Sequence, residues 1–137
     1  MRVRIRVAGR NRLEAKLRRV SAAVERAVAG AVQAGAADVR EAARELLDQP
    51  RAGGPSAPGE PPRKQSGRLR DNIFVRSTDD GLGAEVGTDL DYGAHLEFGT
   101  QKMAARPWLL PAFEAAKPRI RARIAAAVRE ALNRATP

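Results

Sequence analysis

The stretch LRDNIFVRSTDDGLGAEVGT, residues 69–88, decides the fold class of this chain. Its first part, 69–78, reads as a strand, and the segment DDGLG at 79–83 has the aspartates and glycines of a tight turn. The segment AEVGT at 84–88 then returns as a second strand. The pattern therefore predicts an antiparallel hairpin.

Before the hairpin, the N-terminal stretch RVRIRVA, residues 2–8, alternates strictly between basic and apolar residues. A period of two is typical of a half-buried strand, and the cationic outer face would protect an edge strand from unwanted pairing. Gly9 ends this strand. Asn11 followed by Glu14 three residues later predicts a helix start with a capping box.

Two other segments have a helical period. Between residues 12 and 48, apolar side chains recur at spacings of three, four or seven. This predicts one long amphipathic helix, or two helices broken near Gly30 or Gly35. The small residues of its middle, AVAGAVQAGAA, would let another backbone approach closely, either within the subunit or from a neighbour. The last third, from Leu109 onward, is helical again, and Pro118 predicts a kink or a break there.

The predicted elements follow the order strand, long helix, loop, hairpin, helix. This order predicts an α+β fold, in which a small antiparallel sheet of the N-terminal strand and the hairpin is packed by a long N-terminal helix and a C-terminal helix. At 137 residues the chain is most simply a single domain, residues 1–137. The segment 49–67 holds five of the nine prolines and predicts a flexible Pro/Gly-rich loop.

Composition limits the classes of function. Aromatic residues are only 4% of the chain, so the core is expected to be thin and partner subunits to add stability. Cysteine is absent, which excludes disulfides and thiolate metal sites. No apolar run approaches the roughly 20 residues of a membrane span, and the N-terminus does not resemble a signal peptide. We expect a soluble protein without membrane contact, made in the cytoplasm.

The net charge of +9 is distributed unevenly along the chain. Residues 1–19 hold eight basic residues against one acidic, residues 117–134 hold six against one, and residues 77–97 hold six acidic residues with no lysine or arginine. Basic ends and an acidic middle allow two interpretations. One is a non-specific basic DNA-binding protein of nucleoid type, which contacts phosphates. The other is head-to-tail contact between basic and acidic faces of identical subunits in a ring.

The segment YGAHLEFGT, residues 92–100, holds the only tyrosine and the only histidine, and its pattern fits either a strand or a short helix. His95 lies near Asp89, Asp91 and Glu97, but metal sites usually converge several histidines or cysteines. The serines lack a motif that would supply a base, and P-loop, GxGxxG, GxSxG and HExxH motifs are absent. We therefore expect no enzyme activity, and no catalytic, cofactor-binding or metal-ligating residue.

The segments SGRLRDNI, 66–73, and YGAHLEFGTQKMAARPWLLPAFE, 92–114, resemble the head–tail joining or tail-completion proteins of long-tailed double-stranded DNA phages. That family shows Gly before Arg-Leu, then a Tyr, an aliphatic-Glu-Phe-Gly-Thr run, and a Met-x-Ala-Arg-Pro-aromatic-Leu-x-Pro-Ala run. Trp108 stands where the family usually has phenylalanine. The matching positions are Gly67, Arg68, Leu69, Tyr92, Glu97, Phe98, Gly99, Thr100, Met103, Ala105, Arg106, Pro107, Trp108, Leu109, Pro111 and Ala112.

The resemblance implies a structural virion protein that needs no cofactor. Members are expected in the neck or upper tail, usually as rings of six, where they complete or terminate the tail tube and join it to the filled head. The implied partners are further copies of the chain, the tail tube protein and head–tail connector or adaptor proteins. Non-specific contact with DNA passing through the lumen is compatible with this role. Terminator, completion and connector roles stay open.

The resemblance also directs the expected roles of the motif residues. Tyr92 and Phe98 should anchor the scarce core. Gly99 should adopt a backbone conformation closed to other residues. Glu97 should pair with Arg106 and so fix the loop between them against the start of the last helix. The motif at 92–112 is not required by the DNA-binding alternative.

Overall fold

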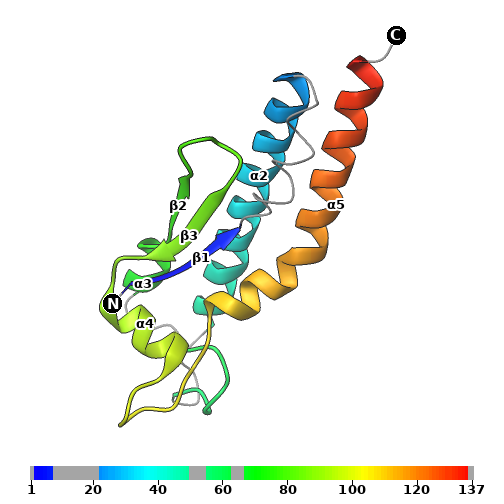
Figure 1. Cartoon of the computed structure of the whole chain (residues 1–137). Helices are drawn as coiled ribbons and strands as arrows, with labels where there is room; N and C mark the ends of the chain where they lie inside the picture. The colour runs from blue at the N-terminus through cyan, green and yellow to red at the C-terminus, as the bar shows by residue number, and fades with distance from the viewer. Residues whose placement is uncertain (1, 8–21, 50–54, 63–66, 136–137) are drawn as a thin grey trace.

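A computed structural model of the protein describes residues 2–7, 22–49, 55–62 and 67–135. The predicted α+β class is confirmed, because a small antiparallel sheet packs with two long helices (Figure 1). The expected helix start at Asn11 and Glu14 lies outside these residues. The elements are β1 (Val3–Val7), α2 (Ala22–Leu47), α3 (Arg68–Asp71), β2 (Phe74–Ser77), β3 (Ala84–Thr88), α4 (Asp91–Phe98) and α5 (Leu109–Ala135).

The sheet places β3 at its centre, in the order β1-β3-β2, with both pairs antiparallel. The β1 pairing runs from Val3 opposite Thr88 to Val7 opposite Ala84. Val3 is buried, whereas Arg4 and Arg6 face solvent, as the alternation predicts. The N-terminal strand is therefore an edge strand of the described sheet.

The hairpin is confirmed, but its first strand is shorter than the predicted 69–78. The residues Arg68–Asp71 form α3, a single helical turn, and β2 begins only at Phe74. Leu69 and Ile73 are both buried. Leu69 lies within this turn, and Ile73 follows it directly before β2. The chain therefore enters the sheet through a helical turn.

The helix α2 continues unbroken through both of its central glycines. At Gly35, a Cβ atom would lie 3.0 Å from Cγ1 of Ile120 on α5. At Gly30, a Cβ atom would meet nothing within 4 Å. The small residues thus serve close packing inside the subunit at Gly35, while the backbone at Gly30 borders open space.

Substitutions at these two glycines should have opposite effects on stability. Gly30→Ala should raise the free energy of unfolding by up to about 1 kcal/mol, because alanine favours the helix and meets no obstacle. Gly35→Leu should lower it by about 1–3 kcal/mol, because the side chain would overpack Ile120. Urea unfolding followed by circular dichroism measures both changes. Equal effects at the two positions would contradict the close approach at Gly35.

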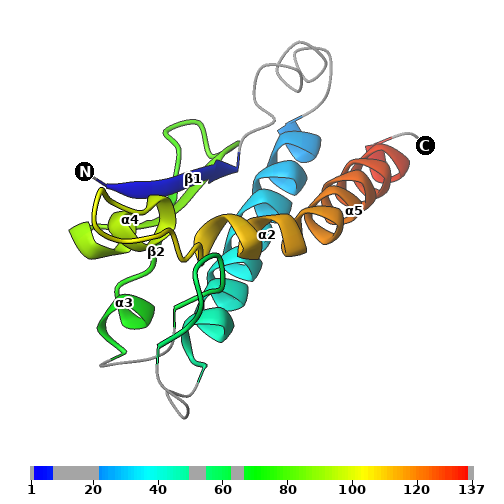
Figure 2. The ribbon, with the colours of Figure 1, turned by 90° about the horizontal axis from the view of Figure 1, so that it is seen from below.

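The helix α5 runs antiparallel to α2 and bends in its first half (Figure 1). Pro118 lies inside α5, where a proline removes one backbone hydrogen bond and bends the axis without ending the helix. The kink is therefore confirmed, and the helix does not break. Seen from below, α2 lies between the sheet and the last half of α5, whereas the first half of α5 crosses α2 (Figure 2). The core fills this layered arrangement, with Val28, Val39 and Val86 completely buried.

Acidic residues of the middle segment are paired within the chain. Glu85 on β3 contacts Arg4, at 3.1 Å, and Arg6 on the neighbouring strand. Asp89 pairs with Arg76 at 3.0 Å. Part of the negative charge of residues 77–97 is therefore neutralised by arginines of the same subunit and is less able to attract a neighbouring subunit.

The ion pairs of Glu85 with Arg4 and Arg6 should make the stability of the protein depend on pH in the acid range. The hydrogen bond from Arg6 lowers the pKa of the Glu85 carboxyl below its ordinary 4.5. The stabilising contribution is therefore fully present above pH 4.5 and is lost as pH falls through the lowered pKa. Glu85→Gln should cost about 0.2–1 kcal/mol at neutral pH. Thermal unfolding of both proteins across an acid series should show the difference vanish at low pH. A difference that persisted there would reflect packing instead.

Candidate functional site

Motif residues from three separate segments meet where α4 contacts the first turn of α5. Trp108 is fully buried at the centre, and its Nε1 donates a hydrogen bond to the carbonyl oxygen of Gly93 at 3.0 Å. A Cβ atom at Gly93 would lie 3.5 Å from the Trp108 ring, 3.0 Å from Leu69 and 2.6 Å from Thr88. The backbone of α4 at Gly93 therefore packs directly against Trp108, Leu69 and Thr88, and a side chain at Gly93 would prevent this close approach.

Glu97 caps the N-terminal end of α5 from a different helix. Its Oε2 accepts hydrogen bonds from the backbone N–H groups of Trp108 and Leu109, both at 2.8 Å, and its Oε1 accepts one from Leu110 at 2.9 Å. The first N–H groups of a helix have no partner within the helix, and a negative charge there is favoured by the helix dipole. The buried carboxylate thus fastens α4 to the start of α5.

The expected ion pair between Glu97 and Arg106 is wrong. The Arg106 guanidinium donates from Nε to the carbonyl oxygen of Ser56 at 3.2 Å, and its backbone N–H donates to Leu96 at 2.6 Å. Three N–H groups converge on the Glu97 carboxylate and occupy the space that Arg106 would need. The arginine instead holds the segment 55–62 of the Pro/Gly-rich loop against the junction.

The loop after α4 is fixed by its own backbone. Gly99 has a φ of 76°, and a Cβ atom there would lie 2.9 Å from both the nitrogen of Ala105 and the carbonyl oxygen of Met103. The expected conformation of Gly99 is therefore confirmed. The Thr100 N–H donates to the Met103 carbonyl at 2.8 Å, and its hydroxyl accepts from the Lys102 N–H at 3.2 Å. The loop folds back tightly and returns the chain to the junction.

Tyr92 and Phe98 do not anchor the core, which corrects the prediction. Phe98 is 66% exposed, Tyr92 is 40% exposed, and Leu110 beside the Glu97 carboxylate is 52% exposed. The reason is that α4 is a helix, and its buried face is taken by other residues. These are Gly93, Ala94 and Glu97. The central aromatic is Trp108, and the exposed Tyr92, Phe98 and Leu110 lie on the two helices that the junction joins.

The remaining motif residues border the junction. Gly67 precedes α3 with a φ of 77°, which favours glycine, and Leu69 is buried. Burial raises the pKa of the Tyr92 phenol, and the nearby Arg68 charge opposes that shift. Pro107 is half-buried directly before the central tryptophan. The structure therefore brings together the segments that carry the motif.

Sequence reasoning missed three residues of the junction: Gly93, Asn72 and Ser56. The Asn72 side chain accepts hydrogen bonds from the Thr88 hydroxyl at 2.7 Å and from the Asp89 N–H at 3.2 Å, which joins the end of α3 to the end of β3. Only Gly93 carries a signal, because a glycine inside a short helix costs stability unless close packing requires it.

Neither metal ligation nor membrane insertion is supported by the part of the chain that the structure describes. It contains no group of three His, Cys, Asp or Glu residues that could hold a metal ion. His95 lies exposed on α4. The described helices include none with the length and hydrophobicity to cross a bilayer.

Comparison with known families identifies the chain through the region that ends with α4 and the glycine after it. Residues 11–99 match the model of a family described as "Bacteriophage HK97-gp10, putative tail-component". The match includes α2, the whole hairpin and α4. Searches of curated proteins and of solved structures return no match. The chain belongs to the HK97 gp10-like family of bacteriophage tail components.

Proposed function

We propose that the protein completes or terminates the tail tube at the phage neck and joins it to the DNA-filled head, as a ring of six copies. Family membership supports the role in the tail. The observation that carries the finer proposal is the exposure of three large apolar residues on α4 and at the start of α5, namely Tyr92, Phe98 and Leu110. Exposed large apolar side chains are suited to contacts with other proteins, because a partner removes them from water.

The junction holds the two helices that carry these exposed residues in fixed positions. The Glu97 carboxylate and the Trp108 side chain hold α4 to α5 through buried hydrogen bonds. Contact residues that stand on a rigid base lose little conformational freedom when a partner binds. The protein would therefore act by assembly: the exposed apolar residues bind tail-tube, connector or identical subunits, and copies close into a ring through heterologous contacts.

Electron microscopy of particles made without this gene tests the proposal. Filled heads with separate tails of normal length would support joining or completion, and overlong tails would support termination of tube growth. Intact virions of normal length would contradict a role in the neck. Complementation with the wild-type gene is the control. Complementation with Phe98→Asp should leave the defect in place, because the exposed ring is lost while the buried junction is kept.

Non-specific contact with DNA is a second candidate, favoured by the surface of α5. Arg119, Arg121 and Arg129 are exposed there and form no ion pair with the rest of the described chain. If each contacts a phosphate, replacing all three with glutamine should reduce the slope of log K against log salt by about 3. Binding to duplex DNA across a salt series measures this slope. An unchanged slope would assign these arginines to solvent or to protein contacts.

A further inference from the structure

We infer that the segment 55–62 is a strap that opens and closes over the loop after α4 while the rest of the subunit stays folded. Its two states decide whether the carbonyl oxygen of Ala105 and the guanidinium of Arg106 are bound within the subunit or free for a partner. Both states belong to a single copy, so the strap can be measured in a monomer and does not depend on the proposed ring.

The strap has a shape of its own. Residues 57–60 form a turn in which the Glu60 N–H donates to the carbonyl oxygen of Ala57 at 3.1 Å. Pro58 stands at the second position of this turn, and Gly59 at the third has a φ of 85°, as in a type II turn. The Glu60 carboxylate also accepts a hydrogen bond from the Ala57 N–H at 3.2 Å. The turn is therefore held by its own hydrogen bonds and keeps its shape when the strap opens.

Two hydrogen bonds join the strap to the rest of the described chain, and both end on the same short piece of it. The Gly59 N–H donates to the carbonyl oxygen of Ala105 at 2.8 Å, and Nε of Arg106 donates to the carbonyl oxygen of Ser56 at 3.2 Å. The strap lies beside this loop at the lower end of the molecule (Figure 1). Apart from Ser56 and Pro62, its residues are not buried. A segment with so few contacts can open without disturbing the sheet or the long helices.

The closed state is also opposed by a feature of Ser56. This residue is only 6% exposed, and its hydroxyl oxygen has no hydrogen-bond partner in the part of the chain that the structure describes. A buried polar group without a partner destabilises the state that buries it, because its hydrogen bonds to water are lost. Opening returns the hydroxyl to water. Two hydrogen bonds therefore favour closure and one unpaired hydroxyl opposes it, which brings the two states close in free energy.

Opening changes what the loop after α4 offers to a partner. In the closed state, Gly59 occupies the carbonyl oxygen of Ala105, and Ser56 occupies the Nε donor of Arg106. A free guanidinium presents a planar fork of N–H donors, which suits a carboxylate. The loop that carries these groups begins beside the exposed Phe98. A partner that binds the freed groups would shift the strap toward its open state.

Native-state hydrogen exchange at the amide of Gly59 measures the opening, since this N–H is protected by its bond to Ala105. The amide of Val86, on the central strand of the described sheet, reports unfolding of the whole subunit. We expect the protection factor of Gly59 to lie at least about a hundredfold below that of Val86. Low concentrations of urea should reduce the protection of Val86 and leave that of Gly59 unchanged, because opening of the strap exposes little surface. Equal protection at the two amides, with a parallel fall in urea, would overturn the inference.

Substitutions at the two partners of one hydrogen bond should change the protection of Gly59 in opposite directions. Ser56→Ala removes the unpaired hydroxyl and keeps the carbonyl, so protection should rise about tenfold. Arg106→Gln removes the bond to Ser56, so protection should fall about tenfold.

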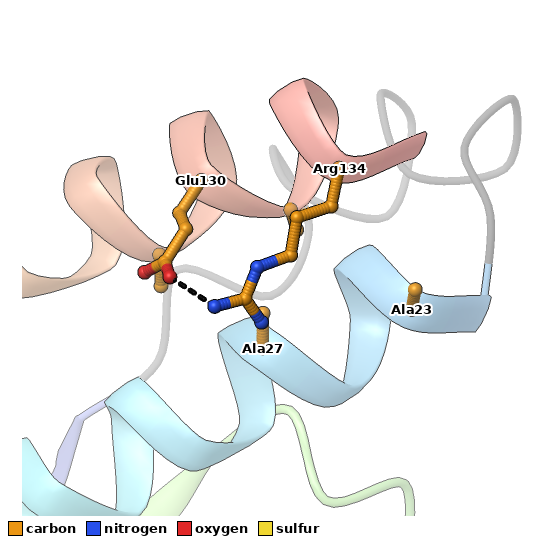
Figure 3. Close-up of a pocket in the computed structure, with 6 residues that line it drawn as sticks. Ala23, Ala27, Glu130 and Arg134 are labelled. Carbon is orange, nitrogen blue, oxygen red and sulfur yellow. Dashed lines mark hydrogen bonds and ion pairs between the residues drawn. The ribbon is translucent and has the colours of Figure 1, made fainter. Parts of the chain in front are cut away.

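The matched control for the second substitution is Arg134→Gln. Arg134 donates to Glu130 one turn earlier on α5, at the other end of the molecule (Figure 3). Its replacement should leave the protection of Gly59 unchanged, and circular dichroism should show all three variants folded. A fall in Ser56→Ala, or no change in Arg106→Gln, would also overturn the inference, because the strap would then not be held and opposed as described.

Discussion

Replacing Trp108 with alanine should lower the free energy of unfolding by about 3–5 kcal/mol, the largest effect expected of any single substitution in this chain. Trp108 is completely buried, and its ring contacts the surface of Gly93 while Nε1 donates to the Gly93 carbonyl. Alanine would leave a cavity that α4 cannot fill, and an unpaired carbonyl oxygen. Since small domains are stable by only about 5–15 kcal/mol, much of the protein should unfold well below the wild-type midpoint.

Trp108→Phe is the matched control for this prediction. Phenylalanine keeps most of the apolar contact and loses the hydrogen bond to Gly93, so the expected cost is about 1–2 kcal/mol. Urea unfolding followed by circular dichroism compares the three proteins, because the substitutions remove the only tryptophan and with it the fluorescence signal. Equal stability of the alanine and phenylalanine variants would show that the indole is not packed as described.

Replacing Glu97 with alanine should cost about 3 kcal/mol or more. The carboxylate accepts three hydrogen bonds from the first backbone N–H groups of α5, and hydrogen bonds to charged groups contribute about 1.5–3 kcal/mol each without being additive. Glu97→Gln should cost less, because its amide oxygen still accepts some of these bonds. Fluorescence of Trp108, whose own N–H is one of the three donors, reports the loss directly. An unfolding midpoint of Glu97→Ala equal to that of the wild-type protein would contradict the role of Glu97 as the cap of α5.

A double-mutant cycle separates the helix cap from the rejected ion pair. In the structure, Glu97 contacts the start of α5, and Arg106 contacts Ser56. The stability changes of Glu97→Gln and Arg106→Gln should therefore add to within about 0.5 kcal/mol. A larger coupling energy between the two substitutions would restore the ion pair.

The sheet and the two long helices could be predicted because their patterns are long and regular. The alternation of the first strand and the three-to-four spacing of the long helices each continue over several repeats, so one interpretation prevails. The elements α3 and α4 could not be separated from strands in this way. In α4, the alternation from Leu90 to Phe98 imitates a strand, and only the packing of Gly93 on Trp108 shows which side is buried.

The sequence indicated which residues build the candidate site, but it did not indicate which of them contact one another. A glycine that follows a short apolar segment suggests a special conformation by its residue type alone, and Gly99 has one. The contact between Glu97 and the start of α5, in contrast, could not be predicted. A capping carboxylate normally lies within one turn of the helix that it caps. Here it is 11 residues before Trp108, and a loop must fold back to bring the two together. The spacing of residues in the sequence does not indicate that this loop folds back.

The position of β1 has a consequence for biosynthesis. Val3 pairs with Thr88, so β1 must wait after its synthesis for a partner that is made 85 residues later. The hairpin of β2 and β3, in contrast, can form as soon as it emerges. During this delay, Arg2, Arg4 and Arg6 keep a β-prone nascent segment charged, which opposes its pairing with other nascent chains. We therefore expect these arginines to matter for the yield of folded protein during translation more than for the stability of the finished subunit.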